Sequence, residues 1–422
     1  MTKRLILAFV FLSWHLVACS NGDSGISSGL PDKPSAEEDS PGTETISEEM
    51  RVKITGEDLY ISAKLDAKTD ILYWFKKCMF NELFTFYRVG TIDNNMPAPA
   101  TLPDASPTSL LNLAYSDNIG PFNITGYGWC GGNHPYLDEV TQTARNIGYR
   151  IYIDGKEIKT DLSTLTKEIK IEVINEIMNP SKADTSSGKT LLNEILCIET
   201  VNYSIYRNNI QVLVTHEFQN ESPVTVQMYY GMQSMFDKET HTLTANGKYV
   251  DWTVQKDVST FTKKEYPSFR RFIEKSANVY QSSYLFADGL GNHEEISDDD
   301  IIFIGNSSNK TYHKIIADRE HKKGDIIHWS GVYTWFKSPV SDDDDLLCYE
   351  GVIDNKKVLF IDCKKNVDRT IQLPVDYTKK SFTIIEKSKS ITITGNKVTA
   401  KGLRIVSDGS GSCLLYTSPS PR

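Results

Sequence analysis

The sequence predicts a mainly β protein built from two or three antiparallel β-sandwich domains. Short runs in which apolar and polar residues alternate recur along the chain and end at turn residues, as strands with one buried face do. Helical periodicity is scarce, and the pattern lacks the long helices that a parallel barrel or a doubly wound fold places between its strands. Because each sheet must bury its apolar face, antiparallel strands over this length imply stacked sheets.

The first 19 residues have the pattern of an export signal. Two basic residues at positions 3 and 4 precede an apolar run from Leu5 to Val17 that is too short to span a bilayer comfortably. The run ends in the tetrapeptide LVAC, which resembles the lipobox of bacterial lipoproteins. That resemblance implies that residues 1–18 are a cleaved signal peptide and that Cys19 carries a lipid that holds the protein on a membrane. The alternative is an ordinary signal peptide followed by an incidental cysteine.

Residues 19–50 are predicted to be a disordered acidic tether, because Ser, Gly, Asp, Glu and Pro dominate and large apolar residues are few. This composition resembles the tethers of surface lipoproteins of the Bacteroidota. Together with the lipobox, the resemblance implies an outer-membrane or cell-surface location.

Three β domains are expected after the tether: an N-terminal domain at 51–190, a central sandwich at 191–347 and a small sandwich at 348–412. In the first, Asp154-Gly155 between two alternating segments predicts a β-hairpin. In the second, residues 197–230 are expected to form a three-stranded meander and residues 268–277 a short helix. The third contains four further strand-like segments, at 357–362, 381–386, 390–394 and 397–406.

The central domain has paired strands and aromatic-rich loops, and it resembles the broad β-sandwiches of carbohydrate-active proteins. These sandwiches include the supersandwich found in sugar mutarotases and some polysaccharide lyases, which the central domain resembles. The last domain resembles the small β-sandwich modules that end many such proteins. No diagnostic motif of these families is present, so the resemblance implies an architecture and not an activity.

Residues 413–422, CLLYTSPSPR, share no pattern with the strands before them and resemble the tail that adapter sequence adds to conceptual translations. On this interpretation the last domain is truncated, the tail packs against nothing, and Cys413 does not count as a thiol of the protein. The alternative is a genuine flexible tail rich in Pro and Ser.

Five other cysteines are scattered along the chain, at positions 78, 130, 197, 348 and 363. Their odd number and the lack of CxxC spacing favour neither a zinc site nor a disulfide framework. Cys348 and Cys363 flank a predicted hairpin and are the first pair to consider for a disulfide in an exported protein. Several of the five are expected to be buried thiols.

Charge and composition narrow the class of partner. The formal net charge is −9 and the basic residues form no long block, which argues against nucleic acid as a partner. Aromatic residues make up 10% of the chain, with 21 tyrosines and 6 tryptophans. Tyr and Trp combine an apolar face with a polar tip, which suits hydroxyl-rich ligands such as sugars as well as cores.

Residues 127–139 form the densest polar and aromatic cluster. Glycines there let the backbone approach a ligand, aromatic rings can stack on a sugar, and amide or imidazole groups can bond its hydroxyls. The expected carbohydrate-binding residues are Trp129, Asn133, His134, Tyr136 and Asp138. The alternative is a turn whose glycines serve the backbone and whose aromatic residues cap a sandwich.

Secondary candidates lie farther along the chain. Trp329 and Trp335 share one face of a predicted strand, which is either core or a glycan-binding platform. Arg270 could hold the carboxylate of an acidic sugar, and His293 lies in a loop where it could act in acid–base chemistry. No cofactor or resident metal is expected; acidic runs at 297–300 and 341–345 could take up Ca²⁺, although solvated loops are the simpler interpretation.

These features predict a lipid-anchored surface protein that binds carbohydrate, as part of a glycan-utilisation system. One alternative is a polysaccharide lyase or glycoside hydrolase, which needs titratable side chains that converge in one cleft. Another is a structural or adhesive lipoprotein with all of its aromatic residues buried. The sequence does not decide whether the protein is an enzyme.

The lipobox predicts that Cys19→Ala releases or mislocalises the protein, because no sulfur remains to be acylated. Membrane fractionation of the variant and the native protein measures this directly, and unchanged anchorage of the variant would remove the claim.

Overall fold

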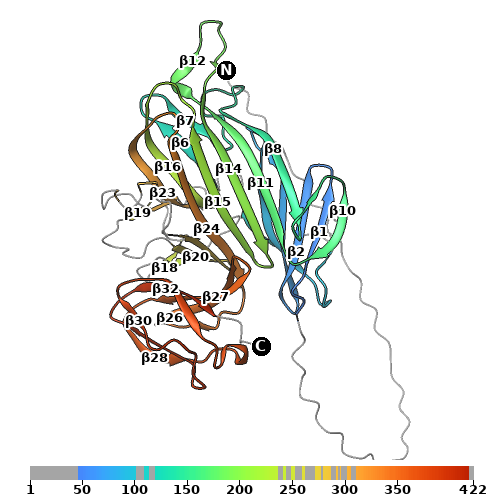
Figure 1. The fold of residues 1–422 in the computed structure, drawn as a ribbon, viewed down its shortest axis with the longest axis vertical. Coiled ribbons are helices and arrows are strands. Elements are labelled where there is room, and N and C mark those ends of the chain that lie inside the picture. Colours follow the sequence, from blue (N-terminus) through green and yellow to red (C-terminus); the bar gives the residue numbers. More distant parts are fainter. Residues whose placement is uncertain are drawn as a thin grey trace, which may run out of the picture. The chain divides into compact units, whose positions relative to one another are not determined.

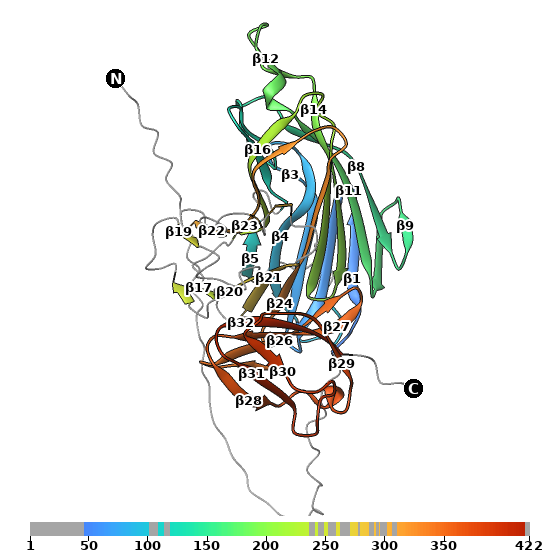
Figure 2. The ribbon, with the colours of Figure 1, turned by 60° about the vertical axis from the view of Figure 1, so that its left-hand side comes forward.

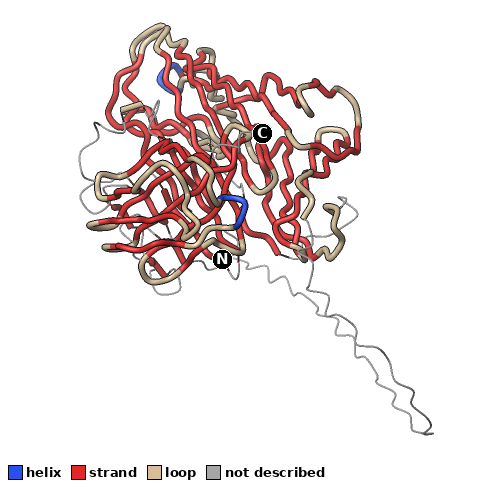
Figure 3. The backbone as a smooth tube through the Cα atoms, turned by 60° about the horizontal axis from the view of Figure 1, so that its bottom comes forward, coloured by secondary structure: helices blue, strands red, loops and turns tan. Residues whose placement is uncertain are grey.

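The computed structural model describes residues 46–100, 109–113, 119–235, 241–243, 249–251, 259–261, 271–276, 279–286, 291–292, 295, 302–305 and 310–417. Strands dominate this part of the chain, with short 3₁₀ turns at Pro180–Lys182 and Val375–Tyr377 (Figure 3). The expected mainly β class is confirmed. Cys19, Arg270, His293 and the acidic run at 297–300 lie outside the described residues. No helix in the described ranges is long and apolar enough to cross a membrane.

The first sheet has six strands. In spatial order they are β10 (Leu162–Thr166), β1 (Met50–Thr55), β2 (Asp58–Asp66), β3 (Thr69–Cys78), β4 (Leu83–Asp93) and β5 (Ser109–Leu113).

The second sheet has ten strands, and its long central members run side by side (Figure 1). In spatial order they are β18 (Tyr249–Asp251), β17 (His241–Leu243), β20 (Arg271–Ser276), β21 (Val279–Leu285), β24 (Ile326–Phe336), β15 (Asn209–Phe218), β14 (Ile195–Tyr206), β11 (Ile169–Met178), β8 (Ala144–Ile153) and β9 (Lys156–Ile158). The predicted hairpin joins β8 to β9. Asp154 and Gly155 both have positive φ, at 47° and 79°, as its tight turn requires.

The third sheet has six strands and carries the loop that the sequence singles out. In spatial order they are β19 (Ser259–Phe261), β22 (Ile302–Gly305), β23 (Lys310–His321), β16 (Val224–Met235), β6 (Pro121–Ile124) and β7 (Gly128–Gly131). A two-stranded ribbon, β12 (Ala183–Asp184) and β13 (Leu191–Leu192), lies between β11 and β14 in the chain.

Both six-stranded sheets pack against one face of the ten-stranded sheet, and residues of all three share a single buried core (Figure 2). From the first sheet, Phe75 contacts Tyr203 of β14 edge to face, with ring centroids 5.3 Å apart. From the third sheet, Phe122 contacts Phe218 of β15 at 6.1 Å. This is the broad sandwich that the sequence suggests, with one wide layer covered by two narrower ones.

A row of polar side chains crosses the core face of the wide sheet, at directly opposed positions of β8, β11, β14 and β15. The side-chain amide of Asn146 donates to Asn175 at 2.9 Å, and Asn175 donates to Glu199 at 2.9 Å. The second carboxylate oxygen of Glu199 lies 2.9 Å from Nε2 of His216. Because each member has a partner in the next strand, Asn175, Glu199 and His216 can stay buried.

The C-terminal strands form a small sandwich with its own core (Figure 1). Its five-stranded sheet has the order β25 (Ser341–Asp342), β26 (Leu346–Ile353), β27 (Lys356–Cys363), β32 (Gly411–Thr417) and β29 (Phe382–Lys387). Its three-stranded sheet has the order β28 (Val367–Ile371), β31 (Leu403–Ser407) and β30 (Ile391–Ile393).

A column of four near-parallel rings docks this sandwich on the outer face of the wide sheet. Tyr280 stacks on Phe336, Phe336 on Tyr349 and Tyr349 on Phe360, with centroid separations of 4.9, 4.3 and 4.9 Å. The Tyr349 hydroxyl also lies 2.6 Å from the hydroxyl of Ser282 in β21. The C-terminal sandwich is therefore packed against the wide sheet through a defined aromatic contact.

Three expectations about local structure are corrected. The meander over 197–230 is wrong in its third strand, because β16 leaves β15 and pairs with β6 and β23 in the opposite layer. The helix over 268–277 is wrong, because β20 pairs with β17 and β21, and Ile273 packs against the C-terminal sandwich. The expected domain boundary between residues 190 and 191 falls between β11 and β14, which pair in the wide sheet. Both expected domains therefore contribute strands to this sheet.

The expectation that residues 413–422 pack against nothing is wrong for residues 413–417. These residues lie in β32, which pairs with β27 on one side and β29 on the other. Cys413, Leu414 and Leu415 are buried, so Cys413 counts as a thiol after all, and burial raises its pKa to about 12. Residues 418–422 lie outside the described residues.

The six cysteines in the described ranges are all buried and none forms a disulfide, so the expectation of buried thiols is confirmed. The candidate pair Cys348 and Cys363 is not bridged. In the β26–β27 register Cys348 lies opposite Ile361 and Cys363 lies opposite Leu346, so the two cysteines are offset along the hairpin.

We expect Leu415→Ala to lower the free energy of unfolding of the C-terminal sandwich by about 2–5 kcal/mol, because it empties space in a closed core. Ile385→Ala is the matched control, since that side chain is 50% exposed on the neighbouring strand and its loss should cost little. Chemical denaturation measures both variants. Equal stability of Leu415→Ala and the native protein would contradict the central position of β32.

Candidate functional site

The β6–β7 hairpin turns Trp129 away from the core. Phe122 of β6 and Cys130 of β7 are opposed and both are buried on the inner side of the third sheet. Side chains alternate along a strand, so the next opposed pair, Asn123 and Trp129, is on the outer side and is half-buried. The surface position of Trp129 therefore follows from the register of two short strands.

Three near-parallel rings form a row on this surface, which we call the ring row: Tyr230, Trp129 and Tyr136. The Trp129 ring lies 5.9 Å from that of Tyr230 and 6.1 Å from that of Tyr136, at interplanar angles of 21° and 28°. Near-parallel rings about 6 Å apart are offset, so each leaves part of its face uncovered. His134 extends the row, with its ring edge-on to Tyr136 at 5.6 Å. All four side chains are half-buried.

Close backbone packing brings Tyr230 beside the hairpin. A Cβ on Gly120 would lie 1.4 Å from the carbonyl oxygen of Tyr230, so only glycine lets the chain enter β6 at this point. Tyr229, the neighbour of Tyr230, faces inward and stacks on Phe122. Tyr230 thus takes the outward position next to Trp129.

The glycine-rich segment after β7 is held by a buried amide from the first sheet. Gly131 and Gly132 have positive φ, at 78° and 55°, and turn the chain back. The side-chain amide of Asn81 donates to the carbonyl of Gly132 at 2.6 Å, and its oxygen accepts from the amide of Thr143 at 3.1 Å. This clamp fixes the segment that carries His134 and Tyr136.

Asp138 organises the next turn. Its Oδ1 accepts the backbone N–H groups of Val140 and Thr141 at 2.9 and 2.6 Å, and its Oδ2 accepts the Thr141 hydroxyl at 2.8 Å. These bonds, first the one from the Val140 N–H and then the one from the Thr141 hydroxyl, lower the pKa of Asp138 to about 2. The carboxylate therefore stays ionised and holds the turn, so it supports the ring row indirectly.

The residues expected from the sequence thus divide into groups. Trp129, His134 and Tyr136 come together on the surface, whereas Asn133 is buried below it. Sequence reasoning missed Tyr230 and Asn81, because Tyr230 reaches the site from β16 and Asn81 from the turn between β3 and β4, both distant in the chain. A local pattern carries no signal for either.

Trp329 and Trp335 are fully buried, so they are core residues and the glycan-platform alternative for them is excluded. Trp329 donates its indole N–H to the hydroxyl of Tyr229 at 2.9 Å, and Trp335 donates to the side-chain oxygen of Gln281 at 3.1 Å. These bonds satisfy the two indole groups inside the sandwich.

The acidic run at 341–345 faces basic side chains of the same sandwich. Asp342 pairs with Lys364 at 3.0 Å and Asp345 with Lys365 at 2.8 Å, while Arg369 pairs with Asp343. The described residues contain no group of three or more His, Cys, Asp or Glu side chains that could hold a metal ion. Three of the four carboxylates of this run are thus paired with lysine or arginine.

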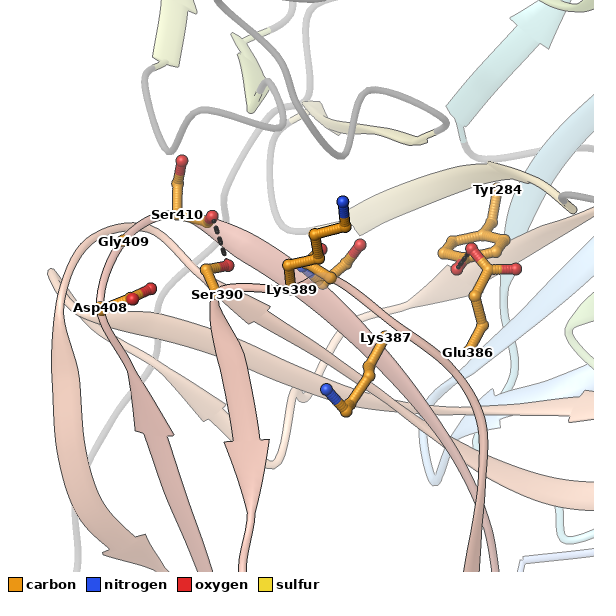
Figure 4. Close-up of a pocket in the computed structure, with 10 residues that line it drawn as sticks. Tyr284, Glu386, Lys387, Lys389, Ser390, Asp408, Gly409 and Ser410 are labelled. Atoms are coloured by element: carbon orange, nitrogen blue, oxygen red, sulfur yellow. Dashed lines mark hydrogen bonds between the residues drawn. The ribbon is translucent and has the colours of Figure 1, made fainter. Parts of the chain in front are cut away.

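A polar cleft of about 720 Å³ lies on the C-terminal sandwich (Figure 4). At one end the hydroxyl of Tyr284 donates to Glu386 at 2.8 Å, and at the other the hydroxyl of Ser390 donates to the carbonyl of Ser410 at 3.0 Å. Lys389 lies between these pairs (Figure 4). Several lining side chains already hydrogen-bond to other lining residues, and the ring of Tyr284 is buried. The cleft therefore has fewer groups available to bind a sugar than the ring row has.

No protein-family model matches the sequence, and no curated protein matches it. Solved structures with a similar arrangement include α-galactosidase AgaB, of glycoside hydrolase family 36, from Geobacillus stearothermophilus. It is 9% identical with a TM-score of 0.38, and the match covers 68% of this chain and 41% of that one. A variant of α-galactosidase AgaA from the same organism, in complex with 1-deoxygalactonojirimycin, is 10% identical with a TM-score of 0.33, over 69% and 41% of the two chains.

A polysaccharide lyase is also similar, at 8% identity and a TM-score of 0.27, over 83% of this chain and 43% of the lyase. These neighbours are carbohydrate-active enzymes, and this chain spans about two fifths of their length. Identities and TM-scores this low do not assign an activity to the chain.

The Asp138 turn generates a prediction about pH. A carboxyl whose pKa is lowered by folding adds stability above its unfolded value of about 3.9, and that stability is lost as the pH falls towards the folded value. We therefore expect the Asp138 turn to loosen between about pH 4 and pH 2. Thr141→Val removes one donor and should raise the midpoint of the Asp138 titration, measured by carboxyl NMR. A native midpoint near 3.9 would contradict the bonding described.

Proposed function

We propose that the protein is a lipid-anchored cell-surface protein that binds carbohydrate at the ring row. The observation that carries this proposal is the set of three offset, near-parallel rings, from β7, β16 and the clamped segment after β7, that are all half-buried at the surface. The faces of a sugar ring present C–H groups, which pack on the electron-rich face of an aromatic ring, while its hydroxyls reach outward. Trp129 provides the largest such face, and His134 adds a hydrogen-bonding group at one end.

Binding is favoured over catalysis by the state of Asp138, the carboxylate in the segment that follows Tyr136. Hydrolysis of a glycosidic bond generally needs two carboxyl groups on opposite sides of it, one of them with a raised pKa. Asp138 has a lowered pKa and its oxygens accept three hydrogen bonds from its own turn. It is therefore a poor proton donor, and the ring row acts as a binding surface.

The anchoring part of the proposal rests on the sequence. The lipobox-like end of the signal at Cys19 supports lipidation, and the acidic segment that follows supports display at a distance from the membrane. A role in a glycan-utilisation system is the context in which a tethered carbohydrate-binding protein would act.

We expect Trp129→Ala to weaken retention on a cognate polysaccharide at least tenfold, which corresponds to about 1.4 kcal/mol. The melting temperature should change little, because the ring is half-buried at the surface. His134→Ala should weaken retention less, since one hydrogen bond exchanged with water is worth about 0.5–1.5 kcal/mol. Tyr127→Ala is the matched control, because Tyr127 is 54% exposed on the same hairpin but outside the ring row.

Affinity electrophoresis over a polysaccharide panel and melting curves on the same samples separate the possible roles. A Trp129→Ala protein that melts early while its folded fraction binds normally would show that the rings serve stability only. Loss of binding in Tyr127→Ala to the same extent would place the binding surface elsewhere on the hairpin.

A further inference from the structure

A second aromatic cluster lies on the outer face of the first sheet, on strands that do not contribute to the ring row. Tyr60 of β2, Trp74 of β3 and Arg88 of β4 are opposed across the strands. The β3–β4 register shifts after Trp74, and this irregularity brings Tyr87 beside Trp74 as well. Together with Lys76, these residues are called the cationic ring cluster, and all five are half-buried.

The rings form an open corner. Tyr60 stacks on Trp74 with centroids 5.4 Å apart at 29°, and Tyr87 meets Trp74 edge to face at 5.0 Å and 86°. The indole N–H of Trp74 donates to the carboxylate of Asp58 at 2.8 Å, which fixes the orientation of the ring. A ring held in this way is already oriented for a ligand that stacks on it.

Two cations converge on the same rings. The ammonium of Lys76 lies 4.5 Å from the Trp74 centroid and 4.2 Å from that of Tyr87, and the guanidinium of Arg88 lies 4.8 Å from Tyr87. Such cation–π contacts hold the charges in place but leave their N–H groups able to bind an anion.

Lys76 and Arg88 form no ion pair with a carboxylate among the described residues, unlike two lysines in the same sheet. Lys64 pairs with Asp70 at 2.8 Å and Lys77 with Glu57 at 3.0 Å, whereas Arg88 donates to the hydroxyl of Tyr87. The Nε of Arg88 is buried and has no acceptor among the described residues. Positive charge is therefore concentrated locally on a protein whose net charge is −9.

We propose that the cationic ring cluster is a separate binding site for an acidic sugar unit, one that carries a carboxylate or a sulfate. The fork of Arg88 and the point charge of Lys76 would take the anionic group, as guanidinium and ammonium groups do. Trp74 or Tyr60 would stack on the sugar ring. Asp58, beside Trp74, can accept a hydrogen bond from a hydroxyl of the same sugar, and this favours a hydroxyl-rich acidic sugar over nucleic acid.

The test measures binding of the full chain to four probes by affinity electrophoresis. Polygalacturonate carries carboxylates and dextran sulfate carries sulfates. Dextran has the same backbone as dextran sulfate but no charge, and oligothymidylate represents nucleic acid. We expect binding to one or both acidic polysaccharides to be at least tenfold weaker in Arg88→Ala and in Lys76→Glu, and to weaken as salt is raised. The carboxylate and sulfate arms then identify the anionic group.

Lys77→Glu is the control for Lys76→Glu, because it makes the same change of charge at the adjacent residue, where Glu57 already pairs with the lysine. Arg88→Lys keeps the charge without the planar fork and should retain part of the affinity. Trp129→Ala should leave binding of the acidic probes unchanged, so failure at the ring row and failure at this cluster are distinguishable. Melting curves identify any variant that does not fold, and Lys76→Glu reports on the cluster if Arg88→Ala is unstable.

Three outcomes would overturn the proposal. The first is a native protein that binds neither acidic polysaccharide more tightly than dextran. The second is an equal loss of binding in Lys77→Glu and Lys76→Glu, which would indicate that binding depends on the overall charge of this surface. The third is tighter binding of oligothymidylate than of either acidic polysaccharide, which would point to nucleic acid.

Discussion

Burial of one face of the ten-stranded sheet is the constraint on which the rest of the structure depends. Trp329, Tyr333 and Trp335 lie in a row on one face of β24 and are fully removed from water. A face this wide and this aromatic needs a cover, and two six-stranded sheets provide it side by side. The chain therefore has to change layers after β15, and that crossing sends β16 to the third sheet. The position of Tyr230 at the surface is a consequence of this crossing.

The polar row from Asn146 to His216 lies in the same core and shows how the strands are kept in register. A buried carboxylate is costly unless hydrogen bonds satisfy it, and Glu199 receives them from both neighbouring strands. A slip of one residue in β14 would turn Glu199 to the outer face and leave Asn175 and His216 without it. Phe122 and Tyr229 enclose the imidazole edge to face, which ties the third sheet to the same row. The hairpin that carries Trp129 thus begins from a strand anchored in the core.

Aromatic residues serve three purposes in this protein, and their chemistry alone does not separate them. Trp335 is core, Tyr349 belongs to the column that docks the C-terminal sandwich, and Trp129 and Trp74 lie half-exposed on two different sheets. What differs is whether a second layer of strands covers the face of the sheet that carries the ring. Where a sheet is covered its rings are buried, and where it faces water the rings are held by neighbouring rings and cations. The two surface clusters also differ in charge, because Lys76 and Arg88 belong to only one of them.

The sequence by itself determined the features that depend on near neighbours in the chain. These include the β class, the Asp154-Gly155 hairpin and the cluster around Trp129, because side-chain alternation and turn chemistry are local properties. Only the tertiary structure decided which strands pair. It placed β16 in another layer, turned residues 271–276 into a strand and took residues 411–417 into the middle of a sheet. It also brought Tyr230 and Asn81 to Trp129. Pairing between distant strands is set by which faces can be buried together, and no local pattern records that choice.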